Sequence, residues 1–294
     1  MKKALIKLHI AILLAGLTGL FGKLILLNEF VLVWYRMLFV AVLLFIWLLI
    51  SGKLKRFNKL GLKKMAIVGS IIGLHWVAFY GSIIHSNISI GVICLSACGF
   101  FSAILEPIIL KKKIKVKELL LGLLAITGIL LIFSFDTRYR IGIAYGLMAA
   151  LLASTFTILN KKYANVSDSS NMVLYQMIFG FLFLTILIPL YIHIKPNISF
   201  LPTITDLLWM LVLSSICTII PWIYQIEALR KVSAFTVNLS YNLEPIYSII
   251  LAFILFKEAK ELNFSFYLGL IIIFIAVIIQ TVSSIHSDQK VPEV

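Results

Sequence analysis

Polar side chains are concentrated in the stretch Asn238–Pro245, which reads NLSYNLEP and lies near the middle of a long apolar segment. Polar groups at that depth of a membrane are costly, so they usually face a bundle interior or a water-filled path. Asn238, Tyr241, Asn242 and Pro245 follow the spacing i, i+3, i+4, i+7 and therefore share one helix face. Pro245 has no N–H, so it leaves one backbone carbonyl free. This face is predicted to bind a polar solute; the alternative is a packing face that hydrogen-bonds a neighbouring helix.

Two carboxylates are candidates for proton coupling. Glu244 lies about 90° from the polar face by the helical period, and a carboxyl at that depth can exchange a proton whenever its site opens to water. Glu106, in Leu105–Glu106–Pro107, is the second candidate. Its alternative interpretation is an interfacial carboxylate paired with a lysine near Lys111. For Glu244 the alternative is a structural pairing inside the bundle.

Arg36 and His75 are the other polar residues that could contact a solute. Arg36 lies about six residues into an apolar segment, and its fixed fork of N–H donors suits a carboxylate or phosphate; the alternative is an interfacial anchor. His75 is the side chain best able to take up a proton near neutral pH, although it could also serve as a packing residue. The predicted substrate-binding residues are His75, Trp76, Tyr80, Tyr224, Asn238, Tyr241, Asn242 and Arg36.

The composition predicts an all-α membrane protein. Of 294 residues, 62% are hydrophobic and 13% are charged, whereas charged residues make up about a quarter of a soluble domain. The apolar runs are long and do not alternate, which favours helices over a barrel. Ten transmembrane helices are predicted, at approximately 5–27, 30–51, 64–84, 88–110, 117–135, 141–160, 171–194, 206–229, 233–256 and 264–285.

Charge places the N- and C-termini on the cytoplasmic side. The connections are short, so neighbouring helices are antiparallel, and a direct count then gives 19 lysines and arginines on the side of the N-terminus against five on the other. Such a bias is typical of cytoplasmic loops. The net charge of +14 is therefore interpreted as the positive charge of cytoplasmic loops and not as a sign of nucleic-acid binding. The expected location is the cell (plasma or inner) membrane. The three cysteines fall inside apolar segments without a matching cluster, so neither a metal nor another cofactor is expected.

The two halves of the sequence resemble each other. Phe101–Ser102 recurs as Tyr247–Ser248, 146 residues later, in the fourth and ninth segments. Each half holds five segments, and an odd number forces the second copy to lie upside down. We therefore predict two inverted five-helix repeats, 1–140 and 141–294. Inverted repeats are typical of transporters, whose site lies at the repeat interface near the midplane.

With these features the chain resembles the drug/metabolite transporter superfamily, EamA type. The resemblance is carried by the five-plus-five arrangement, by Arg36, by Leu243–Glu244–Pro245 and by the acidic Phe256–Lys257–Glu258. One departure is the lysine run Lys111–Lys113, which replaces the acidic residue expected after the fourth segment. The resemblance implies a central cavity lined mainly by segments one, three, four, six, eight and nine. It also implies alternating access for small metabolites, often in the export direction.

The predicted function is therefore a secondary transporter, an exporter of a small organic solute such as an amino acid or metabolite, with proton coupling through Glu244 or Glu106. Two alternatives stay open: an intramembrane enzyme acting on a lipid, and a non-transporting membrane receptor. The sequence has no Gly-rich phosphate loop, HExxH or G-x-S-x-G pattern, so it is not expected to be an enzyme. The expected partners are a small-molecule substrate and the lipid bilayer, without nucleic acid, for a monomer or homodimer.

Overall fold

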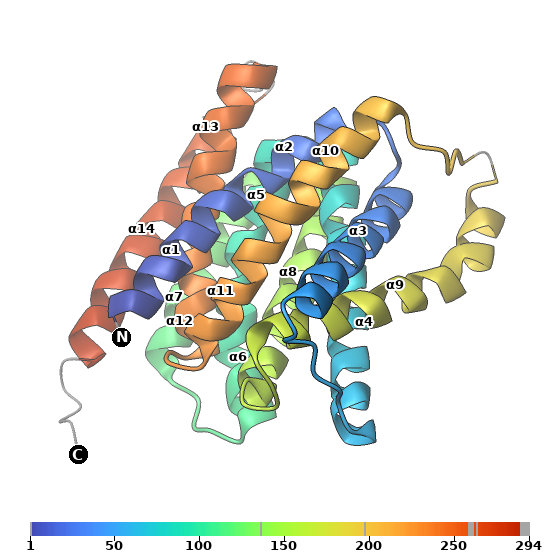
Figure 1. Ribbon diagram of the computed structural model, residues 1–294. Coiled ribbons are helices and arrows are strands. Elements are labelled where there is room, and N and C mark those ends of the chain that lie inside the picture. Colours follow the sequence, from blue (N-terminus) through green and yellow to red (C-terminus); the bar gives the residue numbers. More distant parts are fainter. Residues whose placement is uncertain (1, 136, 197, 258–261, 263, 289–294) are drawn as a thin grey trace.

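The structure is a computed structural model that describes residues 2–135, 137–196, 198–257, 262 and 264–288. Helices make up its regular structure over those residues (Figure 1). The elements are α1 (Lys2–Gly16), α2 (Thr18–Leu24), α3 (Glu29–Ile50), α4 (Lys59–Ile84), α5 (Ile88–Cys94), η1 (Leu95–Ala97), α6 (Cys98–Leu110), α7 (Val116–Phe135), η2 (Thr137–Tyr139), α8 (Arg140–Tyr163), α9 (Ser169–Ile194), α10 (Ile204–Ser214), η3 (Ser215–Ile219), α11 (Ile220–Leu229), α12 (Ala234–Ser240), η4 (Tyr241–Leu243), α13 (Glu244–Phe256) and α14 (Phe264–Asp288).

The prediction of an all-α membrane protein is confirmed. Each of the ten apolar segments falls on one helix or on a run of consecutive helices. Within the described residues, seven helical stretches are long and apolar enough to cross a membrane, and α13 and part of α14 are shorter apolar helices. Ten spanning helices and an inverted second half therefore stay predictions. The seven stretches are Leu5–Leu24, Glu29–Ile50, Lys59–Ile84, Ile88–Leu110, Arg140–Tyr163, Ser169–Ile194 and Ile204–Leu229.

Side-chain caps fix where several helices begin. Asn58 accepts a hydrogen bond from the backbone N–H of Gly61 at 2.8 Å, so α4 begins within the basic loop, about five residues before the predicted start. Asp168 caps α9 outside the spanning stretch. Burial opposes ionisation of the Asp168 carboxyl, but hydrogen bonds from Asn171 and from Lys55 outweigh it and lower its pKa. Such caps satisfy N–H groups that a helix leaves without partners.

The fourth and ninth segments are interrupted in the same way. α5, η1 and α6 contain 7, 3 and 13 residues, and α12, η4 and α13 contain 7, 3 and 13 as well, 146 residues later. Each run ends at a lysine with positive φ, Lys111 at 54° and Lys257 at 55°. Positive φ is uncommon for a residue other than glycine. The matching pattern extends the sequence repeat to the level of helical geometry.

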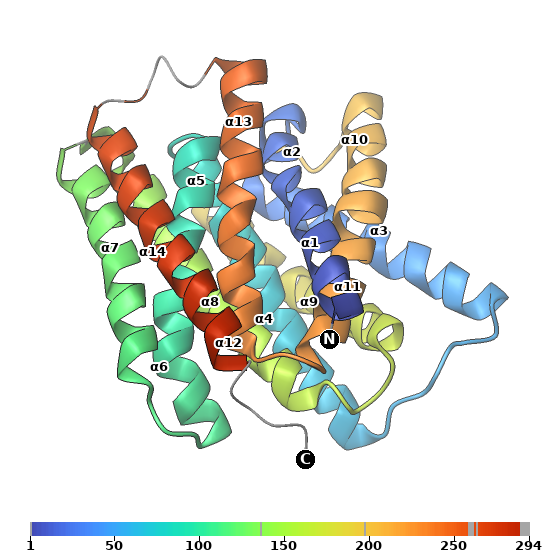
Figure 2. The same cartoon turned by 90° about the vertical axis from the view of Figure 1, so that its left-hand side faces the viewer.

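α4 occupies the centre of the bundle and packs against α8 and α9, while α7 and α14 lie side by side at one edge (Figure 2). Gly69 of α4 and Gly180 of α9 allow a very close crossing. A Cβ on Gly69 would lie 2.1 Å from the carbonyl oxygen of Gln176. Small residues commonly let helix backbones approach in membranes, and here they hold the helix that carries much of the candidate site.

Gly69→Ala is expected to destabilise the protein because its methyl group meets backbone, which cannot move aside. Overpacking of this kind costs about 1–3 kcal/mol. Thermal unfolding in detergent, followed by tryptophan fluorescence, measures the effect. Gly73→Ala is the matched control on the same helix, since a Cβ there lies 3.4 Å from the Leu184 side chain, an ordinary contact. Equal melting temperatures for the two variants would contradict the close crossing.

Candidate functional site

A cavity of about 80 Å³ lies inside the bundle. This is the volume open to the centre of a water-sized sphere, of which one water molecule needs roughly 10–15 Å³. The space therefore admits several waters or part of a small solute. Its lining residues come from both halves of the chain: Ala15, Thr18, Arg36, His75, Trp76, Phe79, Leu95, Cys98, Ala153, Phe156, Thr157, Cys217, Pro221, Trp222, Gln225, Asn238, Tyr241 and Glu244.

Interruptions of helices build much of this lining. Leu95 lies in η1, Cys217 in the π-helical turn η3, and Tyr241 in η4. Irregular backbone at membrane depth is tolerated where it is buried in protein or lines a cavity. The break between α1 and α2 follows the same rule, since Ser248 donates to the carbonyl of Gly16 at 2.6 Å.

Arg36, on α3, is the buried cation of the cavity, with 1% of its surface exposed. Its Nε and Nη2 donate to the hydroxyl oxygen of Thr218 at 3.0 and 2.8 Å, and Nη1 donates to the hydroxyl of Tyr80 at 3.1 Å. The guanidinium carbon lies 3.8 Å from the centre of the Trp76 ring, a cation–π contact. The interfacial-anchor interpretation is therefore not supported, because the side chain is held inside the bundle.

Glu244 is the carboxylate of the same cavity and is 8% exposed. Among the described residues, its side chain takes part in no hydrogen bond or ion pair, and none joins it to Arg36. Opposite charges in a low-dielectric interior normally pair, because an unpaired buried charge is costly. The cavity thus holds one cationic and one acidic group that do not satisfy each other.

His75 lies on the cavity wall beside the rings of Phe79 and Phe156. Its Nδ1 lies 2.8 Å from the carbonyl oxygen of Ala149. A carbonyl only accepts, so Nδ1 carries the proton and Nε2 is the acceptor in the neutral ring. Nε2 has no partner among the described residues, which leaves it available to a donor in the cavity.

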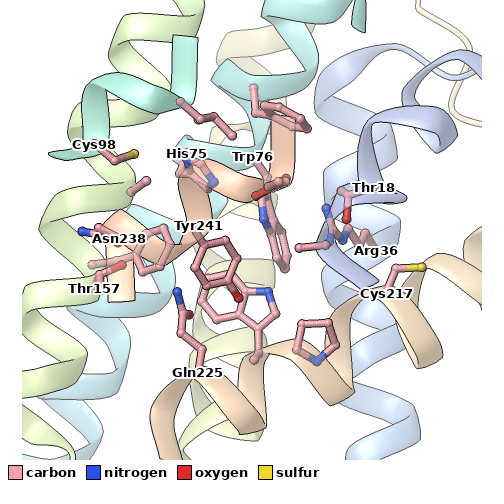
Figure 3. A pocket seen from close by; sticks show the side chains of 18 residues that line it. Thr18, Arg36, His75, Trp76, Cys98, Thr157, Cys217, Gln225, Asn238 and Tyr241 are labelled. Atoms are coloured by element: carbon pink, nitrogen blue, oxygen red, sulfur yellow. The ribbon is translucent and has the colours of Figure 1, made fainter. Parts of the chain in front are cut away.

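The remaining walls are aromatic and polar. Figure 3 shows Arg36 and Cys217 at one side of the cavity and Asn238 at the other, with Trp76 and Tyr241 between them. Asn238 donates to the hydroxyl of Ser102 at 2.6 Å, a contact between the two halves. Trp76 meets Trp222 edge to face, with ring centres 5.3 Å apart. The site can therefore bind a solute with polar ends and an apolar body.

For six of the eight predicted substrate-binding residues, the structure shows whether the side chain lines this cavity. His75, Trp76, Asn238, Tyr241 and Arg36 line it, whereas Tyr80 lies behind Arg36 as its hydrogen-bond partner.

Of the last two predicted contacts, Tyr224 is described and does not line the cavity. The ring of Tyr224 faces Lys7, whose Nζ is 5.1 Å from the ring centre, because residue 224 is two positions beyond Trp222 and about 200° around the helix. The side chain of Asn242 is outside the described part of the structure, as is Glu258 of the acidic motif. These observations do not test whether Tyr224 or Asn242 binds a solute.

Glu106 lies apart from the cavity, in a second hollow of about 60 Å³ beside the lysine-rich loop. Its carboxylate accepts from the backbone N–H of Phe235 at 2.8 Å and from Nζ of Lys112 at 3.2 Å. It therefore joins α6 to the beginning of α12. This arrangement corresponds to the paired interfacial carboxylate that the sequence left open as an alternative.

The sequence prediction overlooked Thr18, Cys217, Gln225 and Thr218, although a pattern was present. Thr218, Pro221, Trp222 and Gln225 follow the spacing i, i+3, i+4, i+7 on one helix face. Over the described residues, no group of His, Cys, Asp and Glu is placed to hold a metal ion.

Comparison with known proteins identifies the family. Residues 2–134 and residues 140–282 each match the model of the EamA-like transporter family. The chain belongs to the EamA-like transporter family. The resemblance to the drug/metabolite transporter superfamily is thereby confirmed, and the two matches together span most of this EamA-like protein.

Individual relatives of this EamA-like protein are distant. A protein of Clostridium kluyveri named "Uncharacterized transporter" is 24% identical over 206 residues, which make up 67% of this chain and 65% of the relative. The chain thus spans about two thirds of that relative. A solved crystal structure superposes with a TM-score of 0.66 over 94% of this chain and 96% of its own, at 13% identity, a likeness that shows the fold alone. Together with the helices, membership of this family indicates a multi-pass membrane protein.

Glu106→Leu is expected to lower the melting temperature in detergent, whereas Glu244→Leu is not. Removing the Glu106 carboxylate leaves a buried N–H of Phe235 without an acceptor, at a cost of about 1–3 kcal/mol. Within the described residues, no N–H donates to the Glu244 carboxylate, so its removal leaves no donor unpaired. Glu118→Gln, which weakens an exposed ion pair with Lys115, is the control and should change little. A larger loss of stability for Glu244→Leu than for Glu106→Leu would contradict the assignment.

Proposed function

We propose that this protein is a secondary transporter that exports a small organic solute, such as an amino acid or a similar metabolite. It would act in the cell membrane, as a monomer or homodimer, with both termini in the cytoplasm. The family supports the class of transporter, and the excess of lysine and arginine on one side of the helices supports the orientation.

The observation that carries the proposal is the separation of charges in the cavity. Arg36 and Glu244 line one space of about 80 Å³ without an ion pair between them. A purely structural pair would gain by contact, since separated buried charges are costly. A solute with an anionic and a cationic end would satisfy both, while the rings of Trp76 and Trp222 would contact its apolar body.

Alternating access would move this solute. The site is assembled from both halves of the chain, and the hydrogen bond between Asn238 and Ser102 crosses between them. Two inverted five-helix halves could rock around such a site and expose it to one side of the membrane at a time. The identical interruptions in the α5–α6 and α12–α13 segments support this symmetry.

Proton coupling is assigned to Glu244 in this proposal. It is the carboxylate of the cavity, so a proton bound there would change the charge that the solute meets. Glu106 already has a backbone and a lysine partner at the rim. His75, with its free Nε2, would contribute a hydrogen-bond acceptor to the solute.

The test is solute movement in proteoliposomes with the twenty protein amino acids and small carboxylic acids, with and without an imposed pH gradient. Wild type is expected to move at least one of them faster with the gradient. Glu244→Gln is expected to lose the dependence on the gradient. Glu227→Gln is the control, because Glu227 pairs with Lys7 and does not line the cavity, so it should behave as wild type.

Two outcomes would contradict the proposal in different ways. Movement that ignores the gradient in wild type and in Glu244→Gln alike would leave a facilitator without coupling. No movement of any solute, with a lipid-derived product accumulating in the membranes, would favour the enzyme alternative instead.

A further inference from the structure

The hydroxyl of Thr218 uses its whole hydrogen-bonding capacity around Arg36. Its oxygen accepts from Nε and from Nη2 of Arg36, at 3.0 and 2.8 Å, and it donates to the carbonyl oxygen of Leu213 at 2.7 Å. A hydroxyl has one proton to donate and two lone pairs. Because the proton is committed to Leu213, both lone pairs point at one edge of the guanidinium.

The π-helical turn η3 explains how Thr218 reaches this position. Leu213, which accepts from Thr218, lies five residues earlier, the spacing of a π turn. Pro221 lies two residues after the end of the turn and has no N–H to donate to the preceding turn of helix. π turns of this kind are frequent at functional sites. The irregular turn thus places the hydroxyl against a buried cation 182 residues earlier in the chain.

The other contacts of Arg36 leave part of its guanidinium open. Tyr80 accepts one N–H of Nη1, and Trp76 covers one face of the group. A guanidinium has five N–H groups, and three are used by Thr218 and Tyr80. One N–H on each terminal nitrogen is therefore left, and among the described residues no carboxylate takes them. Two such groups match the two oxygens of a carboxylate.

We infer that Thr218 is a positioning residue: it fixes the orientation of Arg36 so that the two free N–H groups receive the carboxylate of the transported solute. This inference rests on the proposed function and makes it more specific. Thr218 does not line the cavity, so it acts through Arg36. Rotation of the guanidinium would otherwise spread the donors over several directions, and selectivity for a carboxylate over an uncharged amide would fall.

Neighbouring hydroxyls provide matched controls. Ser214 is buried, and its hydroxyl has no hydrogen-bond partner within the described part of the chain. It precedes the same turn but forms no hydrogen bond with Arg36. Ser214→Ala therefore removes a hydroxyl from the same region without touching the proposed function of Thr218. Thr218→Val keeps the shape of the side chain without the hydroxyl, and Thr218→Ser keeps the hydroxyl.

The first experiment measures the orientation of Arg36 without any solute. The chain has five arginines, so the Nε–H signals of the ¹⁵N-arginine-labelled full-length protein in nanodiscs are few, and Arg36→Lys assigns one of them. In wild type, Ser214→Ala and Thr218→Ser, this N–H should be sharp and slow to exchange with water. In Thr218→Val it should broaden or exchange fast. An unchanged signal in Thr218→Val would overturn the inference.

The second experiment uses the proteoliposome assay with the amino acid that wild type moves fastest and with its carboxamide analogue. Thr218→Val should raise the KM for the amino acid roughly 10- to 100-fold, the range expected when hydrogen bonds to a charged group are lost. The KM for the carboxamide should change far less. Thr218→Ser should restore the wild-type ratio of the two KM values, and Ser214→Ala should leave it unchanged.

The outcomes separate this inference from the proposed function. Transport by wild type together with an unchanged KM ratio in Thr218→Val would overturn the inference and leave the proposed function standing. Equal loss for the amino acid and the carboxamide, without rescue by Thr218→Ser, would mean that Thr218 only stabilises the fold, and would also overturn it. No movement of any amino acid or small carboxylic acid by wild type would contradict both, even if the Nε–H signal behaved as expected.

Discussion

The guanidinium of Arg36 is the charge around which the interior of this protein is organised. It is buried on α3 and held by the hydroxyls of Thr218 and Tyr80 and by the ring of Trp76. A buried cation needs compensation, because removing a charge from bulk water is costly. Neutral hydroxyls and an aromatic face supply part of it, and Glu244 in the same cavity forms no ion pair with Arg36. We propose that a bound solute provides the rest of the compensation.

Irregular helix geometry makes room for the cavity. η1 and η4 interrupt two segments with the same lengths of helix on either side, and η3 widens a third. Each interruption contributes a residue to the cavity: Leu95, Tyr241 and Cys217. The regular crossing of α4 with α9 at Gly69 holds the opposite wall in place. In this EamA-like protein, interrupted helices thus contribute residues to the cavity, and the continuous helices α4 and α9 pack closely and support it.

Hydropathy and charge predicted the helices, because every backbone group in a lipid environment must be satisfied within a helix. Helical spacing also brought Asn238 and Tyr241 to one cavity. Helical spacing did not predict that Tyr80 lies outside the lining. Its role as a hydrogen-bond partner of Arg36 depends on where Arg36 lies in the folded structure. Thr218 shares a helical spacing with Pro221, Trp222 and Gln225, but its contact with Arg36 was out of reach, because the π turn that contains Thr218 adds a residue and rotates the helix face by about 100°. The contact between Thr218 and Arg36 joins residues 182 positions apart. It follows from tertiary packing, which no local sequence pattern predicts.

The most direct test of the account is an experimental structure of the protein with a transported solute bound in the central cavity. We predict the anionic group of the solute within about 3 Å of Nη1 and Nη2 of Arg36, with its cationic end toward Glu244 and Thr218 still in contact with Nε. A solute bound elsewhere, or an Arg36 that turns away to pair with Glu244, would contradict the central claim that the unpaired charge is reserved for the solute.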